Sequence, residues 1–205
     1  MIKFSNLQVM GWEHAIRGMR NPMNSWDKID TEYDIIGDND HKLMMTLRNA
    51  GSDHRKFMRM ITVYLDITAP LYWWKEFDTY KVGTVANSCS TMHRIHSKEF
   101  TLSDFSYEHL VVENVWVLEE VIKQLNKYRE KFIETRDKSY WWQMIQLLPT
   151  SYNQKRTVML NYEVLANMYH SRKAHKLDEW RVFCELIESL HYSEFITGEV
   201  LEDVY

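Results

Sequence analysis

The segment LPTSYNQKRTVMLNYEVLANMYHSRKAHKLDEWR, residues 148–181, decides the fold that we predict, because it places polar side chains within an apolar helical pattern. Residues three and four positions apart share one face of a helix. One face of this segment is apolar and consists of Leu160, Val164, Leu165 and Met168. The opposite face carries Glu163, Ala166 and His170. We therefore expect a helix that includes residues 160–172 and buries its apolar face.

Two polar side chains, Asn161 and Arg172, lie on the apolar face of this predicted helix. Eleven residues separate them, which corresponds to roughly 16 Å, or three turns along one line. A guanidinium that is buried without a partner loses several kcal/mol of solvation. Arg172 is therefore expected to meet an internal carboxylate, a partner subunit or a ligand, and an internal ion pair is the commonest of these arrangements.

The spacing of these residues resembles a motif of the flavin-dependent thymidylate synthases. Asn161, Asn167 and Arg172 follow Leu148-Pro149 and precede Asp178-Glu179-Trp180-Arg181. The matching segment of the family also follows Leu-Pro, reads Asn-x-Arg-x-x-x-Asn-x-x-x-x-Arg and leads into a Gln-x-Glu-Ile-Arg-like run. Glu163 replaces the middle arginine, and the downstream run is one residue closer.

The resemblance extends upstream, where Ile67-Thr68-Ala69-Pro70 is similar to the strand-Ala-Pro-helix segment of the family. In the family this segment leads to Arg-His-Arg-x-x-Ser-x-Asn-Glu-x-Ser-x-Arg. Aligning Asn87 with the family asparagine places Ser90 on the second serine. The remaining positions differ: Tyr80, Lys81 and Val82 stand at Arg-His-Arg, Val85 at the first serine, Ser88 at the glutamate and Met92 at the last arginine.

The resemblance implies an α+β fold, a mainly helical single domain (residues 1–205) with a small antiparallel sheet. It implies reductive methylation of dUMP to dTMP with methylenetetrahydrofolate as carbon donor and NADPH as the reductant of bound FAD. It also implies a homotetramer with nucleotide and flavin clefts at subunit interfaces. The implied site residues are Arg172 and Ser90 as catalytic residues, Asn161, Asn167 and Lys81 toward the flavin, and Asn87, Ser88, Ser90 and Arg172 toward the nucleotide.

The departures from the motif keep two other functions open. Each bidentate arginine that is absent removes charge-assisted hydrogen bonds worth roughly 1.5 to 3 kcal/mol. In the first alternative, the chain is a nucleotide-binding or structural relative without activity. In the second, it is a different nucleotide-modifying flavoenzyme with another base or acceptor. Four nearby cations are available as substitutes, although lysine lacks the planar fork of arginine: Lys75, Lys81, His93 and Arg94.

The composition is that of a globular protein. The 205 residues are 45% hydrophobic and 26% charged with a net charge of −4, which gives no electrostatic case for general binding to nucleic acid or a membrane surface. No apolar run approaches the length of a transmembrane helix, and no export signal opens the chain. Cys89 and Cys184 lack CxxC spacing, so we expect reduced thiols in a cytoplasmic protein, Cys89 as a small buried residue. The pair His93-x-x-His96 has no further ligand at suitable spacing, so no metal is expected.

The remaining pattern predicts a small sheet among helices. Strands are expected at residues 2–10, at the edge of the sheet, 58–68 and 98–102, and the second presents Ile61, Val63, Leu65 and Ile67 to the core together with Arg59. Residues 84–90 form a small, hydroxyl-rich loop, either an ordinary turn or a segment that approaches a ligand. Helices are expected at residues 12–19, 41–49, 71–77, 114–136 (capped by Asn114), 140–147 (capped by Ser139) and 177–190.

Overall fold

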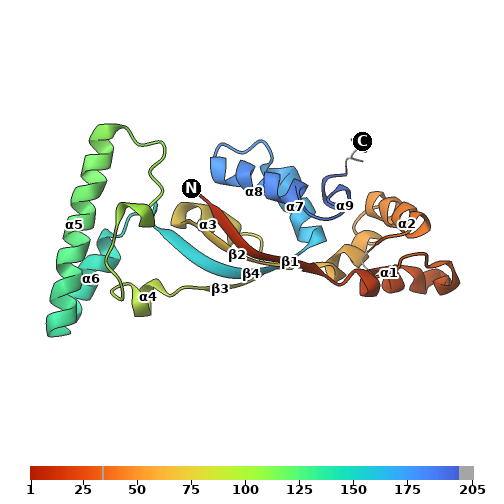
Figure 1. The fold of residues 1–205 in the computed structure, drawn as a ribbon, viewed down its shortest axis with the longest axis horizontal. Helices are drawn as coiled ribbons and strands as arrows, with labels where there is room; N and C mark the ends of the chain where they lie inside the picture. The colour runs from red at the N-terminus through yellow and green to blue at the C-terminus, as the bar shows by residue number, and fades with distance from the viewer. Residues whose placement is uncertain (34, 199–205) are drawn as a thin grey trace. The chain divides into compact units, whose positions relative to one another are not determined.

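The computed structural model describes residues 1–33 and 35–198, in which four strands form one antiparallel sheet with the order β1-β2-β4-β3 (Figure 1). The strands are β1 (Lys3–Met10), β2 (Thr62–Pro70), β3 (Val85–Ser88) and β4 (Asn153–Asn161). The predicted edge strand at residues 2–10 is confirmed, because β1 has a single neighbour, β2.

Helices make up most of the remaining described chain. The α-helices are α1 (Trp12–Arg20), α2 (Asp38–Asn49), α3 (Leu71–Phe77), α4 (Thr91–Arg94), α5 (Val112–Thr135), α6 (Lys138–Leu147), α7 (Tyr162–Arg172), α8 (Asp178–Glu188) and α9 (Glu194–Thr197). Short 3₁₀ turns are η1 (Asn21–Met23), η2 (Trp26–Lys28), η3 (Arg55–Met60) and η4 (Leu102–Asp104). Every predicted helix has a counterpart in the structure. None of the described helices is both long and apolar enough to cross a membrane.

The main correction concerns Leu160 and Asn161, which we predicted to belong to a helix but which end strand β4. Val158 and Leu160 are buried, whereas Thr157 is exposed, and this alternation is a strand period. A short apolar run fits either period, and the pairing of β4 with β2 decides between them. Asn161 and Arg172 are therefore not on one helical line, and Ala166, predicted to point outward, is buried.

Three other local predictions are wrong. Residues 98–102 form a loop that leads into η4, and the sheet takes β3 and β4 instead. Strand β2 begins at Thr62, so Arg59 belongs to η3, although Val63, Leu65 and Ile67 do face the core. The predicted caps are displaced: Val111 precedes α5, and the side chain of Asp137 caps α6.

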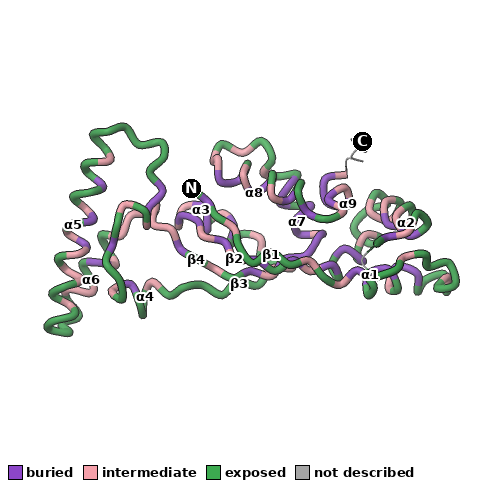
Figure 2. The backbone as a smooth tube through the Cα atoms, viewed as in Figure 1, coloured by how far each residue is buried: buried purple, intermediate pink, exposed green. Residues whose placement is uncertain are grey.

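The chain divides into two compact units. Unit 1 comprises Met1–Phe4, Ile67–Thr79 and Asn87–Thr157, and unit 2 comprises Ser5–Asp66, Tyr80–Ala86 and Val158–Tyr205. That residues 1–205 form one domain stays a prediction. In unit 1, α5 packs on α6, and many residues of α5 are exposed (Figure 2). The buried cluster of unit 1 consists of Ile95, Phe100, Phe105, Leu118, Ile122, Leu125 and Met144.

The core of unit 2 surrounds α7. This helix packs against η3, α8 and α9, and its first residue, Tyr162, is fully buried. The Tyr162 ring contacts the edge of Trp12 at 5.2 Å between centroids, and its hydroxyl donates to the carbonyl of His191. Burial raises the pKa of Tyr162 well above its ordinary value, so the hydroxyl remains a donor at neutral pH.

A buried ion pair fixes the loop that precedes α2 in unit 2. The Asp40 carboxylate is fully buried and accepts hydrogen bonds from Arg20 Nε at 2.9 Å and Arg20 Nη2 at 2.6 Å. Its second oxygen accepts from the backbone nitrogens of Asp30 and Thr31 and from the Thr31 hydroxyl. The carboxylate thus balances a buried cation and satisfies three donors of the loop.

We predict that Asp40→Ala lowers the free energy of unfolding by about 3–5 kcal/mol, because Arg20 is left as an uncompensated buried charge. Chemical denaturation measures this loss. Asp38→Ala is the matched control: Asp38 is exposed in the same first helical turn, so its loss costs less than about 1 kcal/mol. Equal losses in the two variants would contradict the role given to Asp40.

Candidate functional site

A cavity of about 290 Å³ in unit 2 contains both asparagines that the sequence assigns to a cofactor. We call it the Asn161 cavity. Its lining residues are Arg59, Val82, Gly83, Asn161, Glu163, Val164 and Asn167. The structure therefore brings Asn161 and Asn167 together, although they come from the end of a strand and the middle of a helix. Lys81, the third predicted cofactor residue, is exposed and is not among the lining residues.

Asn161 holds the junction between β4 and α7. Its Oδ1 accepts a hydrogen bond from the backbone nitrogen of Val164 at 2.9 Å, which caps the helix. Its amide nitrogen faces Gly83, where a Cβ atom would lie 2.7 Å away. Gly83 has φ +80°, a left-handed conformation that favours glycine. The absent side chain lets the backbone at Gly83 approach the amide closely.

Glu163 brings a negative charge to this cavity, at the position where the motif that the chain resembles has an arginine. Its carboxylate, 13% exposed, pairs with Arg59 through two contacts, one of them 3.2 Å from Arg59 Nη2 to Glu163 Oε1. Arg55 Nε lies 3.5 Å from the same Oε1. Arg59 thus brings a guanidinium to the cavity from η3. Arg59 could not be predicted as a site residue, because its contact with Glu163 spans 104 positions of the chain and leaves no local signal in the sequence.

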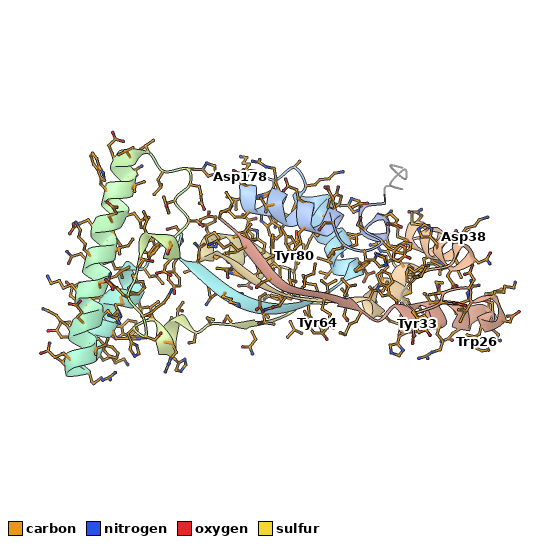
Figure 3. The ribbon with its side chains drawn as sticks, viewed as in Figure 1. Trp26, Tyr33, Asp38, Tyr64, Tyr80 and Asp178 are labelled. Atoms are coloured by element: carbon orange, nitrogen blue, oxygen red, sulfur yellow. The ribbon has the colours of Figure 1, made fainter. Side chains whose placement is uncertain are left out.

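Arg172 lies at the end of α7 in an aromatic environment. Its Nε donates to the Tyr80 hydroxyl at 2.9 Å, and its guanidinium carbon lies 4.8 Å from the Trp180 ring centroid and 5.5 Å from that of Tyr80. Tyr80 is labelled in Figure 3. Cation–π contacts of this kind contribute about 0.5–2 kcal/mol and hold the plane of the guanidinium. Tyr80, which stands where the motif has arginine, therefore positions the predicted catalytic cation.

A larger cavity of about 420 Å³ lies in unit 1 and includes Ser90, so we call it the Ser90 cavity. Ser90 caps α4: its hydroxyl accepts from the backbone nitrogen of His93 at 3.0 Å and lies 2.9 Å from His93 Nδ1. Asn87 and Ser88 precede it as exposed residues of β3 and are not among the lining residues. The predicted loop at residues 84–90 is therefore mostly an edge strand.

Cys89 lines the same cavity and is exposed, so its predicted burial as a small hydrophobic residue is wrong. Two backbone hydrogen bonds fix it: its nitrogen donates to the Lys155 carbonyl at 2.9 Å, and its carbonyl accepts from Gln154 Nε2 at 2.8 Å. Cys184, in contrast, is buried, and burial raises the pKa of its thiol to about 11. Cys89 is therefore the more accessible of the two thiols.

The predicted site residues fall into two groups, one in each unit. Asn161, Asn167 and Arg172 belong to unit 2, whereas Ser90 and its neighbours belong to unit 1. Across residues 1–33 and 35–198, no three His, Cys, Asp or Glu side chains gather as a metal site.

Comparisons with known proteins identify the fold. In sequence, the chain matches no protein-family model and no curated protein. In structure, it is similar to Thymidylate Synthase X (ThyX) from Helicobacter pylori, solved with FAD and dUMP, with TM-score 0.72 and 15% identity over 97% of this chain and 98% of that chain. It is also similar to the UMP/dUMP methylase PolB from Streptomyces cacaoi, solved with 5-Br UMP, with TM-score 0.59 and 12% identity over 92% and 86% of the two chains. The chain therefore has the α+β fold of Thymidylate Synthase X, and the predicted fold class is confirmed.

We predict that Gly83→Ala destabilises the protein more than Gly51→Ala. Both glycines have positive φ, so alanine at either position costs about 1–2 kcal/mol of backbone strain. Only at Gly83 does the new Cβ displace Asn161 and its cap, which adds about 0.5–2 kcal/mol. A Cβ at Gly51 meets nothing within 4 Å. Thermal or chemical unfolding of both variants gives the difference, and equal stabilities would show that Gly83 does not support the Asn161 cavity.

Proposed function

We propose that this chain methylates a pyrimidine nucleotide reductively, converting dUMP to dTMP with methylenetetrahydrofolate as carbon donor and NADPH as electron donor. The observation that carries the proposal is the likeness in fold, over nearly the whole of both chains, to a thymidylate synthase that binds FAD and dUMP. By the same resemblance, we propose a homotetramer that works in the cytoplasm with clefts at its subunit interfaces. The residues of the Asn161 cavity give the proposal its local support.

The Asn161 cavity has donors and acceptors suited to the polar edge of a flavin ring. The amide of Asn167 offers both kinds of group and Arg59 adds a guanidinium, while Asn161, whose Oδ1 caps α7, forms the wall beside Gly83. A volume of about 290 Å³ is at the lower end of the roughly 300–1,000 Å³ of small-molecule sites, so this cavity suits part of FAD. FAD, when bound, supplies the hydride for the methyl group.

Arg172 is the residue that we assign to the pyrimidine. Its Nε is engaged by Tyr80, and Trp180 lies beside its guanidinium, so the cation has a fixed direction. A prearranged cation stabilises the negative charge that develops on a pyrimidine carbonyl when carbon 5 acts as the nucleophile. Ser90 is assigned to the nucleotide loop, together with Asn87 and Ser88. Lys81 remains the third residue proposed for the flavin.

A second function is favoured by one observation, the Glu163 carboxylate in the Asn161 cavity. A carboxylate repels the phosphates of a dinucleotide unless Arg59 neutralises it. If neutralisation is insufficient, the chain binds a nucleotide without converting it. The likeness to a UMP/dUMP methylase also makes UMP a substrate to compare with dUMP.

We predict that the purified protein, supplied with FAD, NADPH and methylenetetrahydrofolate, forms dTMP from dUMP, and that Arg172→Ala lowers the rate by about 10²–10³-fold through loss of charge stabilisation. Arg136→Ala is the matched control, because Arg136 is an exposed arginine of unit 1 that lines neither of the two cavities. Its rate should stay within about twofold of the unchanged protein. Product formation is followed by chromatography.

Tyr80→Phe separates positioning from stability in this experiment. It keeps the ring beside Trp180 but removes the hydroxyl that holds Arg172 Nε. A loss of rate without a change in unfolding temperature supports the assigned role of Arg172. No dTMP or methylated UMP from the unchanged protein, with nucleotide still bound, would favour the binding protein instead.

A further inference from the structure

His96 follows α4 and packs on α5, in surroundings that suit a neutral imidazole. Its ring lies edge-to-face with that of Phe132, with 4.8 Å between centroids. Its Nδ1 is buried and has no hydrogen-bond partner within the described part of the chain. A neutral imidazole can carry its single proton on the other nitrogen, whereas an imidazolium carries a proton on both. Protonation would therefore leave a charged N–H buried without an acceptor, which is unfavourable.

The charges around His96 also oppose its protonation. Among the described residues, every charged group that shifts the pKa of His96 is an arginine: Arg136, Arg94 and Arg129. Arg129 Nε donates to the carbonyl of His96 itself at 3.0 Å. The Arg136 guanidinium carbon lies 5.9 Å from the centroid of the Phe132 ring that His96 contacts. A proton on His96 therefore adds a fourth positive charge to one cluster, and like charges disfavour the charged form.

Contacts from both α5 and α6 attach residues 91–98, which we call the α4 segment. Trp141 Nε1, on α6, donates to the Met92 carbonyl at 3.1 Å. On α5, Arg129 binds the His96 carbonyl and Phe132 packs against the His96 ring. The same segment forms part of the wall of the Ser90 cavity. Loosening of the α4 segment would therefore open this wall.

The direction of the pH dependence follows from the surroundings of His96. Burial and the three arginines lower its pKa below the ordinary value of 6.5. If the α4 segment leaves α5, the imidazole regains its ordinary pKa, so the released form binds the proton more readily than the docked form. Docking is therefore strongest above about pH 6.5 and weakens as the pH falls from there towards the lowered pKa.

We propose that His96 is a pH-sensitive latch, whose neutral imidazole docks the α4 segment on α5 and whose protonation loosens the segment and opens one wall of the Ser90 cavity. The latch depends on contacts within unit 1. It does not depend on the reaction that the chain catalyses, so its test needs no substrate or cofactor.

The other titratable groups near the α4 segment are distinguished from His96 by their environment. Lys98, at the end of the segment, pairs with Asp104. Burial raises the pKa of Asp104, but the bonds from Lys98 and Thr101 outweigh it and hold the pKa below the ordinary value. Asp104 therefore stays ionised in the range where histidines titrate. His93, on α4, is exposed and serves as the control.

Hydrogen–deuterium exchange of the full-length protein, read by mass spectrometry of its peptides, measures docking of the α4 segment. After correction for the intrinsic effect of pH on exchange, we expect the amides of residues 91–98 to exchange about 5-fold faster at about pH 5.5 than at about pH 7.5. Exchange in the middle of α5 should change by less than about 2-fold. Exchange of the α4 segment that does not depend on pH would overturn the latch.

Two variants assign the effect to one histidine. His96→Phe keeps a ring against Phe132 but cannot titrate, so its α4 segment should exchange at the same corrected rate at both pH values. His93→Gln removes the other histidine of the segment and should keep the 5-fold change, to within about 2-fold. A pH dependence that persists in His96→Phe, or that disappears in His93→Gln, contradicts the assignment to His96.

A direct titration covers the case in which His96→Phe does not fold. The ring protons of His96 in the unchanged protein are followed by nuclear magnetic resonance between about pH 5 and pH 8, and His96→Gln identifies their signal. A midpoint below 6.5 is expected, because the docked imidazole resists protonation. A midpoint at or above 6.5 would mean that docking does not oppose the proton, and the latch would be refuted.

Discussion

The position of the Asn161 amide, where a Cβ at residue 83 would otherwise lie, is the constraint on which the candidate site depends. One end of the amide caps α7 through Val164, and the other lies where only a glycine leaves room. The polypeptide therefore changes from strand to helix at a fixed point. Asn167 and Glu163, on the first turns of α7, are then held beside Asn161 in one cavity. Arg172, at the end of the same helix, contacts Tyr80 and Trp180.

The charged side chains of the candidate site stand at different positions of the sequence from those of the motif that the chain resembles. Glu163 stands where that motif has arginine, yet Arg59 returns a guanidinium to the same cavity from η3. Tyr80 stands where the motif begins with arginine, yet it contacts the Arg172 guanidinium. These pairs connect residues far apart in the chain, so changes that look like losses in the sequence are accompanied by new partners in the fold.

The sequence predicted the type and position of most elements because their periodicity is strong. The helices at residues 12–19 and 177–190 are examples. It failed at residues 153–161, where a short apolar run fits both periods and the neighbouring strand β2 decides. Caps were also misplaced, because Asp137 is as good a capping residue as the predicted Ser139, and Val111, which precedes α5, makes no side-chain cap.

Part of the site was also accessible from sequence. The spacing of Asn161 and Asn167 predicted residues that do share a cavity, whereas Arg59 and Gly83 carried no signal, since their roles arise from contacts across the fold. Titration of the purified protein with FAD, followed by visible absorbance, tests the central claim most directly. The account predicts saturable flavin binding that weakens by at least about 10-fold in Asn167→Ala, because this exposed residue lines the cavity without capping a helix. Absence of flavin binding, or binding unchanged in Asn167→Ala, would contradict it.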